Sequence, residues 1–422
     1  MKYEAVLFDF DGTIADSGLG ITHCVAYACE KMGLEVPAED TLRKFVGPPL
    51  VNSFREFTGL DRDRAMQAVS CFRERYNKLG WQECSIYPGI APLLKALKKR
   101  GIYLAVASGK PQIFIERILN FFGLAACFDK IVGIVSEDAD NDKRTLITHA
   151  LPEGADLKHT AMVGDRKFDM EAAKALGLHA VGALYGFGSR EELQASGADE
   201  IADDVAMLRE ILLPGEETER GLFISFEGAD GCGKSTQMHK LARYLSNHGY
   251  EVVCTREPGG CPISERIREV LLDIRNLGMS SECEALLYAA SRAEHVRTVI
   301  LPGVAAGKIV LCDRFLDSSF AYQARGRELG DDFIRQINTA AAKAVPDRTL
   351  LFVGDREAVL KRLRAGENLD RLEVETDDFF RRVYEGYESV RTADPMRVHE
   401  IDSRGSIEEI FEKVLLDLSD LI

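Results

Sequence analysis

Two segments of this 422-residue chain follow the same order, in which a short apolar run leads to a turn rich in glycine and acidic residues and then to a long amphipathic stretch. The apolar runs are residues 5–8 and residues 222–226. Apolar runs that alternate with helical patterns are typical of strands joined by helices in a parallel sheet. The sequence therefore predicts an α/β protein with two parallel sheets, each with its own candidate catalytic edge.

A polar, acidic stretch at residues 214–221 separates the two segments and lacks a periodic apolar face. We interpret it as a linker between a domain of residues 1–213 and a domain of residues 222–422. Residues 17 to about 84 have helical patterning, whereas a strand pattern returns at residues 103–107. The first domain is therefore expected to carry an inserted helical cap.

The composition of the chain argues against nucleic-acid and membrane partners. The formal net charge is −15, whereas bulk nucleic-acid binding needs a basic surface. No run approaches the ~18 uncharged apolar residues of a membrane-spanning helix, and the first residues do not resemble a secretory leader. We therefore expect a cytoplasmic protein. Ten cysteines without a Cys-x-x-Cys pair indicate neither a zinc site nor a redox pair.

Two carboxylates, Asp9 and Asp11, directly follow the first apolar run, where an open parallel sheet presents side chains to its ligands. Strand alternation places both on one side, where one could attack phosphorus while the other moves the proton of the leaving group. Taken alone, these residues also fit a helix cap followed by a turn.

Four further polar residues follow later elements of the first domain. Ser108 ends a strand pattern and could donate to a phosphate oxygen. Lys143 begins a helical pattern and offers a positive charge, although it also fits a solvated surface position. Asp165 and Asp169 follow another strand pattern and could complete a magnesium site.

Taken in order, these residues resemble the four motifs of the haloacid dehalogenase superfamily of phosphatases over residues 1–213, and residues 164–169 are similar to its phosphoglycolate phosphatase and nucleotidase branch. The resemblance implies a Rossmann-like fold with an inserted cap and hydrolysis of a small phosphate monoester, which the cap sequence does not identify. It implies Asp9 as the nucleophile that forms an aspartyl-phosphate, and Asp11 as the acid/base. It further implies phosphoryl binding by Ser108 and Lys143, and the magnesium ligands Asp9, Asp11, Asp165 and Asp169.

A phosphate-binding loop is indicated at residues 228–235, because these residues follow an apolar run and precede an amphipathic helix. Small residues leave backbone N–H groups free to bind phosphates, Lys234 can neutralise charge on the transferred group, and Ser235 can ligate Mg²⁺. The candidate ATP-binding residues are Gly228, Ala229, Asp230, Gly231, Cys232, Gly233, Lys234, Ser235 and Thr236.

Basic and aromatic residues indicate the site of a phosphate acceptor. Arg256 lies beside a glycine turn and can clamp a phosphate, and Arg314 follows a later strand pattern. Tyr288 and Arg292, one helical turn apart, place a ring and a guanidinium on one face, which suits a nucleobase. Tyr288 also fits a plain core position.

These motifs resemble thymidylate kinase along nearly all of residues 222–422, which implies a P-loop nucleoside monophosphate kinase fold, a parallel sheet flanked by helices. The resemblance implies phosphoryl transfer from ATP to dTMP, giving ADP and dTDP, with Mg²⁺ and without a covalent protein intermediate. It implies that Tyr288 stacks on thymine, that Arg292 reaches its carbonyl, and that Tyr322 lies against the sugar and favours deoxynucleotides. The implied dTMP-binding residues are Asp230, Arg256, Tyr288, Arg292, Arg314, Ser319, Tyr322 and Gln323.

A lid at residues 361–371 is implied to supply positive charge to the transferred group, because Gly231 stands where some family members carry arginine. Gly366 stands where related lids often have another arginine. Arg362, Arg364 and Arg371 therefore remain alternatives for the arginine that reaches the phosphates. A helical face salt-bridged to nearby glutamates is the other interpretation. The candidate catalytic residues of this half are Lys234, Arg314, Arg362, Arg364 and Arg371.

Two other functions fit parts of the sequence. The first domain could be a regulatory module that binds a ligand without turnover, although the intact pair Asp9 and Asp11 argues against this. The second could be a kinase for another nucleoside monophosphate or a GTPase-like switch, although a switch does not need acceptor-side arginines. By resemblance to thymidylate kinases we also expect a homodimer.

Overall fold

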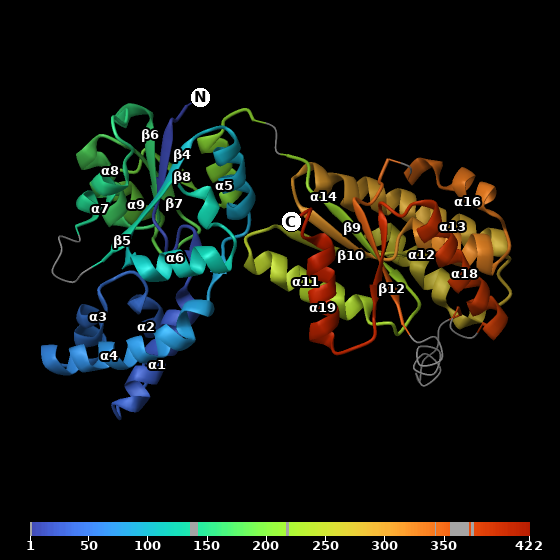
Figure 1. Cartoon of the computed structure of the whole chain (residues 1–422), viewed down its shortest axis with the longest axis horizontal. Coiled ribbons are helices and arrows are strands. Elements are labelled where there is room, and N and C mark those ends of the chain that lie inside the picture. The colour runs from blue at the N-terminus through green and yellow to red at the C-terminus, as the bar shows by residue number, and fades with distance from the viewer. Residues whose placement is uncertain (1, 136–141, 217–218, 342, 355–370, 373–374) are drawn as a thin grey trace. The chain divides into compact units, whose positions relative to one another are not determined.

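The computed structural model describes every residue except 1, 136–141, 217–218, 342, 355–370 and 373–374, and it consists of two compact units (Figure 1). The first unit contains Met1–Glu216 and Ser246–Tyr250, and the second contains Glu217–Leu245 and Glu251–Ile422. Across the described ranges, no helix is both long enough and apolar enough to cross a membrane.

The first unit is built on a six-stranded sheet of order β5-β4-β1-β6-β7-β8, in which every pairing is parallel. Its strands are β1 (Ala5–Phe8), β4 (Tyr103–Pro111), β5 (Lys130–Ile134), β6 (Thr160–Gly164), β7 (His179–Ala183) and β8 (Glu200–Ala202). Its helices outside the cap are α5 (Ile90–Lys99), α6 (Gln112–Phe121), α7 (Lys143–Ala150), α8 (Lys167–Leu176), α9 (Arg190–Ala195) and α10 (Val205–Leu212), with the 3-10 turns η3 (Ala125–Cys127) and η4 (Leu157–His159).

Burial on both faces explains why β1 is apolar throughout. Val6 and Phe8 belong to one core cluster of the unit, whereas Ala5 and Leu7 belong to another. Because successive side chains of a strand point to opposite faces, the sheet has a core on each side. The sheet can therefore present polar groups only at its edges and strand ends.

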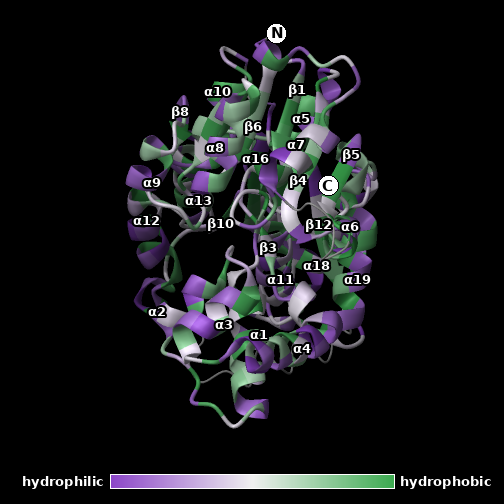
Figure 2. Cartoon of the chain, turned by 90° about the vertical axis from the view of Figure 1, so that its left-hand side faces the viewer, coloured by the Kyte–Doolittle hydropathy of each residue, from purple (hydrophilic) through white to green (hydrophobic). Residues whose placement is uncertain are grey.

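The helical insertion predicted from the sequence lies between β1 and β4. Its strongest helix signal is Asp61, which precedes α4 and accepts a hydrogen bond from the Arg64 N–H, as a helix cap does. In Figure 2, α4 carries both purple and green residues, as a helix with one buried face should. The elements of the insertion are β2 (Ala15–Asp16), α1 (Gly18–Lys31), α2 (Glu39–Leu42), η1 (Arg43–Phe45), α3 (Leu50–Thr58), α4 (Arg62–Lys78), η2 (Gly80–Gln82) and β3 (Ser85–Ile86).

The second unit is built on a five-stranded parallel sheet of order β10-β11-β9-β12-β13, with helices on both faces (Figure 1). Its strands are β9 (Phe223–Gly228), β10 (Val252–Arg256), β11 (Ile309–Asp313), β12 (Arg348–Val353) and β13 (Val398–Asp402). Its longer helices are α11 (Lys234–Asn247), α12 (Pro262–Leu272), α13 (Ser281–His295), α18 (Asp377–Ala393) and α19 (Ile407–Leu418). Its shorter helical elements are η5 (Ile274–Asn276), η6 (Val296–Ile300), α14 (Leu301–Ala305), α15 (Leu316–Ser319), η7 (Phe320–Gly326), α16 (Asp331–Ile337) and η8 (Thr339–Ala341). The predicted α/β class with two parallel sheets is thus confirmed.

One segment differs from its predicted local structure, and another takes a form that the sequence did not predict. The strand predicted at residues 103–107 continues as β4 to Pro111, so Ser108 lies inside it, beside a shift of the pairing register with β5. The polar segment at residues 318–323 is helical and passes from α15 into the π-helix η7. π-helical turns are frequent at functional sites.

Candidate active sites

The first candidate site lies where β1, β4 and β6 end. Phe8 pairs with Val106 of β4 and with Val163 of β6, so the residues that follow these strands meet at one edge. Asp9 follows β1, and its N–H donates to the Val163 carbonyl over 2.9 Å. Ser108 is buried in the neighbouring strand. Parallel pairing therefore gathers polar side chains that lie far apart in the chain.

Three buried carboxylates form a cluster at this edge. One oxygen from each of Asp9, Asp165 and Asp169 lies within 4.8 Å of the others. Lys143, the first residue of α7, donates to Asp9 Oδ1 over 2.6 Å and lies 2.7 Å from Asp169 Oδ1. Burial, opposed by the Lys143 charge and reinforced by Asp169, raises the pKa of Asp9 to about 6. Burial and the other two carboxylates also raise the pKa of Asp165 well above its usual value.

The structure does not place the Asp11 carboxylate in this cluster, which departs from the predicted magnesium set. Lys110 donates to both Asp11 oxygens, over 2.9 and 3.2 Å, and its ammonium lies 5.1 Å from the ring of Tyr76 in the cap. Lys110 was not among the predicted site residues, because the strand was expected to end at Ser108. Its position two residues after Ser108, on the same side of a strand, is the signal that would have found it.

The charges of the first site fit a divalent cation. Four carboxylates, those of Asp9, Asp11, Asp165 and Asp169, face two ammonium groups, which leaves an excess of two negative charges when all are ionised. Asp165 Oδ1 is also buried without a hydrogen-bond partner among the described residues. Carboxylate oxygens are the ligands that Mg²⁺ prefers in proteins. The three clustered carboxylates therefore fit a magnesium ion.

The second candidate site begins at the loop between β9 and α11. Gly228 has a φ of +130°, and a Cβ atom there would lie 2.5 Å from the Phe352 carbonyl oxygen, so only glycine fits. Lys234, the first residue of α11, is buried and donates to Asp230 Oδ1 over 3.0 Å. The loop thus holds a lysine ammonium at the start of a helix, where anions bind.

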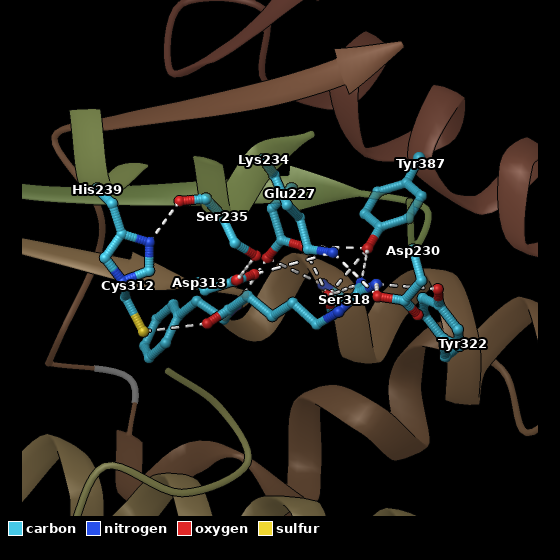
Figure 3. Close-up of polar contacts among 12 residues, drawn as sticks. Glu227, Asp230, Lys234, Ser235, His239, Cys312, Asp313, Ser318, Tyr322 and Tyr387 are labelled. Atoms are coloured by element: carbon cyan, nitrogen blue, oxygen red, sulfur yellow. Dashed lines mark hydrogen bonds and ion pairs between the residues drawn. The ribbon is translucent and has the colours of Figure 1, made fainter. Parts of the chain in front are cut away.

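A hydroxyl and a carboxylate meet beside this lysine. Ser235 Oγ donates to Asp313 Oδ2 over 2.5 Å (Figure 3), and Asp313 Oδ1 lies 3.9 Å from the Lys234 ammonium. Within the described part of the chain, Asp313 Oδ1 is buried and has no hydrogen-bond partner. A buried carboxylate oxygen without a hydrogen-bond donor, next to a serine hydroxyl, fits a magnesium ion.

A pocket adjoins the loop and contains most of the predicted acceptor residues. Those that line it are Asp230, Tyr288, Arg292, Arg314, Ser319, Tyr322 and Gln323. The other lining residues are Glu257, Pro258, Arg268, Leu272, Phe315, Ser318 and Leu372. Arg256, the last residue of β10, is the predicted residue that does not line the pocket. Its Nη2 lies 2.9 Å from Glu265 Oε2. The pocket shares Asp230 with the loop, so a ligand in it lies next to the phosphate-binding residues.

Arg314 connects the loop to the pocket. Its Nη2 donates to Asp230 Oδ1 over 2.7 Å, and its Nη1 donates to Ser318 Oγ over 3.1 Å and to the Tyr387 hydroxyl over 2.9 Å. Figure 3 shows that the side chains of Asp230, Ser318 and Tyr387 lie close to one another. Burial raises the pKa of Asp230, but the charges of Arg314 and Lys234 outweigh it and hold that pKa below its usual value. The pocket wall therefore carries both charges of a strong ion pair.

Glu227 is a buried acidic residue that sequence analysis missed. Its Oε1 accepts from the Phe315 N–H over 2.7 Å, and its Oε2 accepts from Ser318 Oγ over 2.6 Å and from the Tyr387 hydroxyl over 3.0 Å. Burial, reinforced by Asp317 and opposed by Arg314, raises the pKa of Glu227 to about 7. A glutamate inside an otherwise apolar strand is the signal that would have found it.

The raised pKa of Glu227 predicts a pH dependence of stability. Its folded-state pKa of about 7 lies above the ordinary value of 4.5, so the folded state binds more protons between these values. The stabilisation is fully present below pH 4.5 and is lost as the pH rises through about 7. We expect the thermal midpoint of the second unit to fall between pH 5 and 8, and to fall less in Glu227→Gln. Calorimetry at several pH values measures this, with the exposed Glu282→Gln as control. Equal falls in Glu227→Gln and the wild type would contradict the prediction.

Arg292 is held at the pocket wall by three protein acceptors. Its Nε donates to Glu257 Oε2 over 2.7 Å, its Nη1 to Asn338 Oδ1 over 2.7 Å, and its Nη2 to the Phe315 carbonyl over 3.2 Å. A guanidinium carries five N–H groups, so two of them are not used by these three acceptors of the described chain and can meet a ligand carbonyl. Arg292 and Tyr288 thus both line the pocket. That they bind the base stays a prediction.

The predicted lid lies largely outside the described residues. Arg362 and Arg364 belong to the part of the chain that is not described. Arg371 is described, and it is buried, with its Nη2 2.7 Å from Glu284 Oε2 and its Nε donating to the Leu271 carbonyl over 2.8 Å. In this structure Arg371 is therefore engaged by protein acceptors instead of facing the loop.

Comparison with known proteins gives a separate match for each half of the chain. Residues 6–183 match the family model of haloacid dehalogenase-like hydrolases, and residues 226–414 match that of thymidylate kinase. The thymidylate kinase of Finegoldia magna is 48% identical over 195 residues, which are 46% of this chain and 96% of that protein. The thymidylate kinase of Bacillus pumilus is 42% identical over 205 residues, 48% of this chain and 97% of that protein. Among solved structures, a predicted phosphatase from Clostridium acetobutylicum is 39% identical, with 50% of this chain and 98% of that chain covered and a TM-score of 0.47.

Proposed function

Because the chain belongs to the thymidylate kinase family through its C-terminal half and carries a haloacid dehalogenase-like hydrolase domain in its N-terminal half, we propose that it is a bifunctional enzyme. The second domain transfers a phosphoryl group from ATP to dTMP, which gives ADP and dTDP. The first domain hydrolyses a small phosphate monoester. Both reactions are phosphoryl transfers with magnesium, and we place them in the cytoplasm.

One observation carries the kinase proposal: the pocket beside the phosphate-binding loop is lined by seven of the eight predicted acceptor residues, which come from three separate stretches of the chain, at residue 230, within 288–292 and within 314–323. A nucleobase needs an aromatic face and hydrogen-bonding groups, which Tyr288, Arg292 and Gln323 offer. The acceptor phosphate needs a positive charge near the loop, which Arg314 offers. This combination supports a nucleoside monophosphate as the acceptor.

In the kinase, protein groups position two phosphates and stabilise the charge that develops between them. Lys234 lies at the start of α11, where it can pair with the transferred phosphoryl group. Arg314 can exchange its contact with Asp230 for the phosphate of dTMP. Ser235 and Asp313 would hold Mg²⁺, which supplies charge neutralisation between the donor phosphates.

In the phosphatase, Asp9 acts as the nucleophile and Asp11 as the acid/base. An Asp9 carboxylate oxygen forms a bond to phosphorus while the bond to the leaving-group oxygen breaks and Asp11 gives a proton to that oxygen. Water then attacks the phosphorus, Asp11 accepts its proton, and the bond to Asp9 breaks, which releases inorganic phosphate. Ser108 and Lys143 stabilise the phosphoryl oxygens from neighbouring elements. Asp9, Asp165 and Asp169 would hold Mg²⁺, which supplies electrophilic stabilisation of the phosphoryl group.

The magnesium assignment predicts opposite effects of Asp165→Asn on metal binding and on metal-free stability. Removing one of three clustered carboxylates should weaken Mg²⁺ binding by about tenfold or more, measured by titration calorimetry. It should also relieve repulsion in the cluster, so the metal-free variant should melt no lower than the wild type. Unchanged Mg²⁺ affinity, or a metal-free variant that melts well below the wild type, would show that Asp165 has a structural role instead.

The bifunctional proposal is tested on the full chain with two separate assays. ADP formation from ATP and Mg²⁺ should depend on dTMP and be far weaker with dGMP or dAMP. Phosphate release without ATP should be measured on dTMP, dUMP and phosphoglycolate. Hydrolysis of a nucleoside monophosphate would indicate that the fusion controls a nucleotide pool, whereas activity on none of a wide panel would leave the first domain as a regulatory module. Light scattering at twice 46.8 kDa would support the homodimer that the kinase resemblance implies.

A further inference from the structure

Glu284 is a buried carboxylate that does not line the pocket, yet it binds a residue that does. It lies on α13 and is fully buried. Arg327 Nη2 donates to its Oε2 over 2.9 Å, and Arg371 Nη2 lies 2.7 Å from the same oxygen. Two guanidinium groups thus face this one carboxylate and pair with it. An ionised carboxylate only accepts hydrogen bonds.

This acceptor determines how the Gln323 amide is turned. Gln323 Nε2 donates to Glu284 Oε1 over 2.9 Å. Because Glu284 cannot donate, the NH₂ group of Gln323 must face it, and the Gln323 carbonyl oxygen must face away. Gln323 lines the pocket from the π-helix η7. The group of Gln323 that is left for a pocket ligand is therefore an acceptor.

The pocket wall then carries a donor and an acceptor on different elements. Arg292 supplies N–H groups from α13, and Gln323 supplies its carbonyl oxygen from η7. A thymine or uracil ring has a C4 carbonyl acceptor next to an N3–H donor, which complements this pair. A cytosine ring has the reverse order, a C4 amino donor next to an N3 acceptor. The Glu284 contact thus favours one class of pyrimidine.

We propose that Glu284 is a positioning residue for base selection, which holds the Gln323 amide so that its carbonyl accepts from the N3–H of a thymine or uracil ring and rejects cytosine. The proposal rests on the proposed kinase function and adds to it the origin of pyrimidine selectivity. The carboxylate acts through Gln323 and does not touch the nucleotide. Its two arginine partners act by holding the carboxylate in place.

The test is the selectivity of full-length Glu284→Gln between dTMP and dCMP. An amide at position 284 can donate as well as accept, so the Gln323 amide can turn and present its NH₂ group to the ligand. The ratio of kcat/KM for dTMP to that for dCMP should fall about tenfold or more, mainly through KM, while KM for ATP stays unchanged. A merely structural defect would lower both kcat/KM values by the same factor and leave the ratio as it was.

Two further measurements make the result decisive. Glu282→Gln, an exposed substitution on the same helix, should keep the wild-type ratio. If Glu284→Gln shows no cooperative unfolding transition, Glu284→Asp decides the question, because it keeps the charge for the arginines but shortens the reach to Gln323. A folded variant with an unchanged ratio overturns this inference alone. A wild-type chain without dTMP-dependent ADP formation overturns the proposed kinase function and the inference with it.

Discussion

Lys234→Ala is expected to lower dTMP-dependent ADP formation by about 10³-fold, mainly through kcat. Lys234 is buried at the start of α11, and in this structure its ammonium is held by Asp230 at 3.0 Å. In this position Lys234 can stabilise the negative charge that develops on the transferred phosphoryl group in the transition state. Removal of one such preorganised donor lowers the rate about 10²–10³-fold. Loss of a full positive charge belongs at the upper end of that range. Steady-state kinetics with saturating ATP and dTMP measure the effect.

The two activities on one chain provide the control for this prediction. Phosphate release by the first domain should be unchanged in Lys234→Ala, because its residues form a separate sheet edge. Asp230 keeps its contact with Arg314 at 2.7 Å in the variant, so the loop wall should retain its ion pair. A loss below tenfold would mean that Lys234 serves to neutralise Asp230 and does not stabilise the transferred group.

Asp9→Asn is expected to lower phosphate release from a monoester by more than about 10⁴-fold. The amide has the shape of the carboxylate but cannot form the acyl-phosphate bond, and loss of a nucleophile typically removes most of the catalysis. The substitution also removes one of three carboxylates that lie within 4.8 Å of each other. The variant should therefore fold, and its thermal midpoint without metal should not fall.

The kinase reaction of the same variant is the matched control. ADP formation with dTMP should stay at the wild-type rate in Asp9→Asn, which excludes a general loss of folded protein. Trapping of phosphate on the wild-type chain after a rapid acid quench, and its absence in Asp9→Asn, would identify the aspartyl-phosphate. Retention of more than a tenth of the hydrolysis rate would assign the nucleophile to another group, of which Asp11 is the nearest candidate by sequence.

Most of the fold follows from local sequence patterns. Residues 5–8 are a continuous apolar run because both faces of their sheet are buried. Residues 222–226 are apolar except for Ser225, since β9 is buried along its whole length, and the turns after both runs carry glycine and acidic residues. Such patterns repeat within a few residues, so they can be read without knowledge of the tertiary structure. The end of β4 was misplaced because its last residues are polar, as strand residues at a site edge often are.

The position of most predicted site residues also follows from a general property of parallel sheets. Because parallel strands end at one edge, Asp9 and Asp165 had to meet, and so did the loop and Arg314. Their chemistry could be anticipated because carboxylates, lysines and glycine-rich loops have few uses in such positions. The lid arginines could not be placed by this rule, since the predicted lid at residues 361–371 begins eight residues after the end of β12 and so does not directly follow a strand end.

The sequence alone determined the two α/β domains and the residue types at their strand ends, because burial and chain direction impose short, regular patterns on the residues concerned. Only the tertiary structure decided which side chains are partners. Lys110 binds Asp11 from 99 residues away, Glu284 binds Gln323 from 39 residues away, and Glu227 binds Tyr387 from 160 residues away. Such contacts depend on how separate elements pack and on which buried charges find a counterpart, and no local pattern encodes that choice.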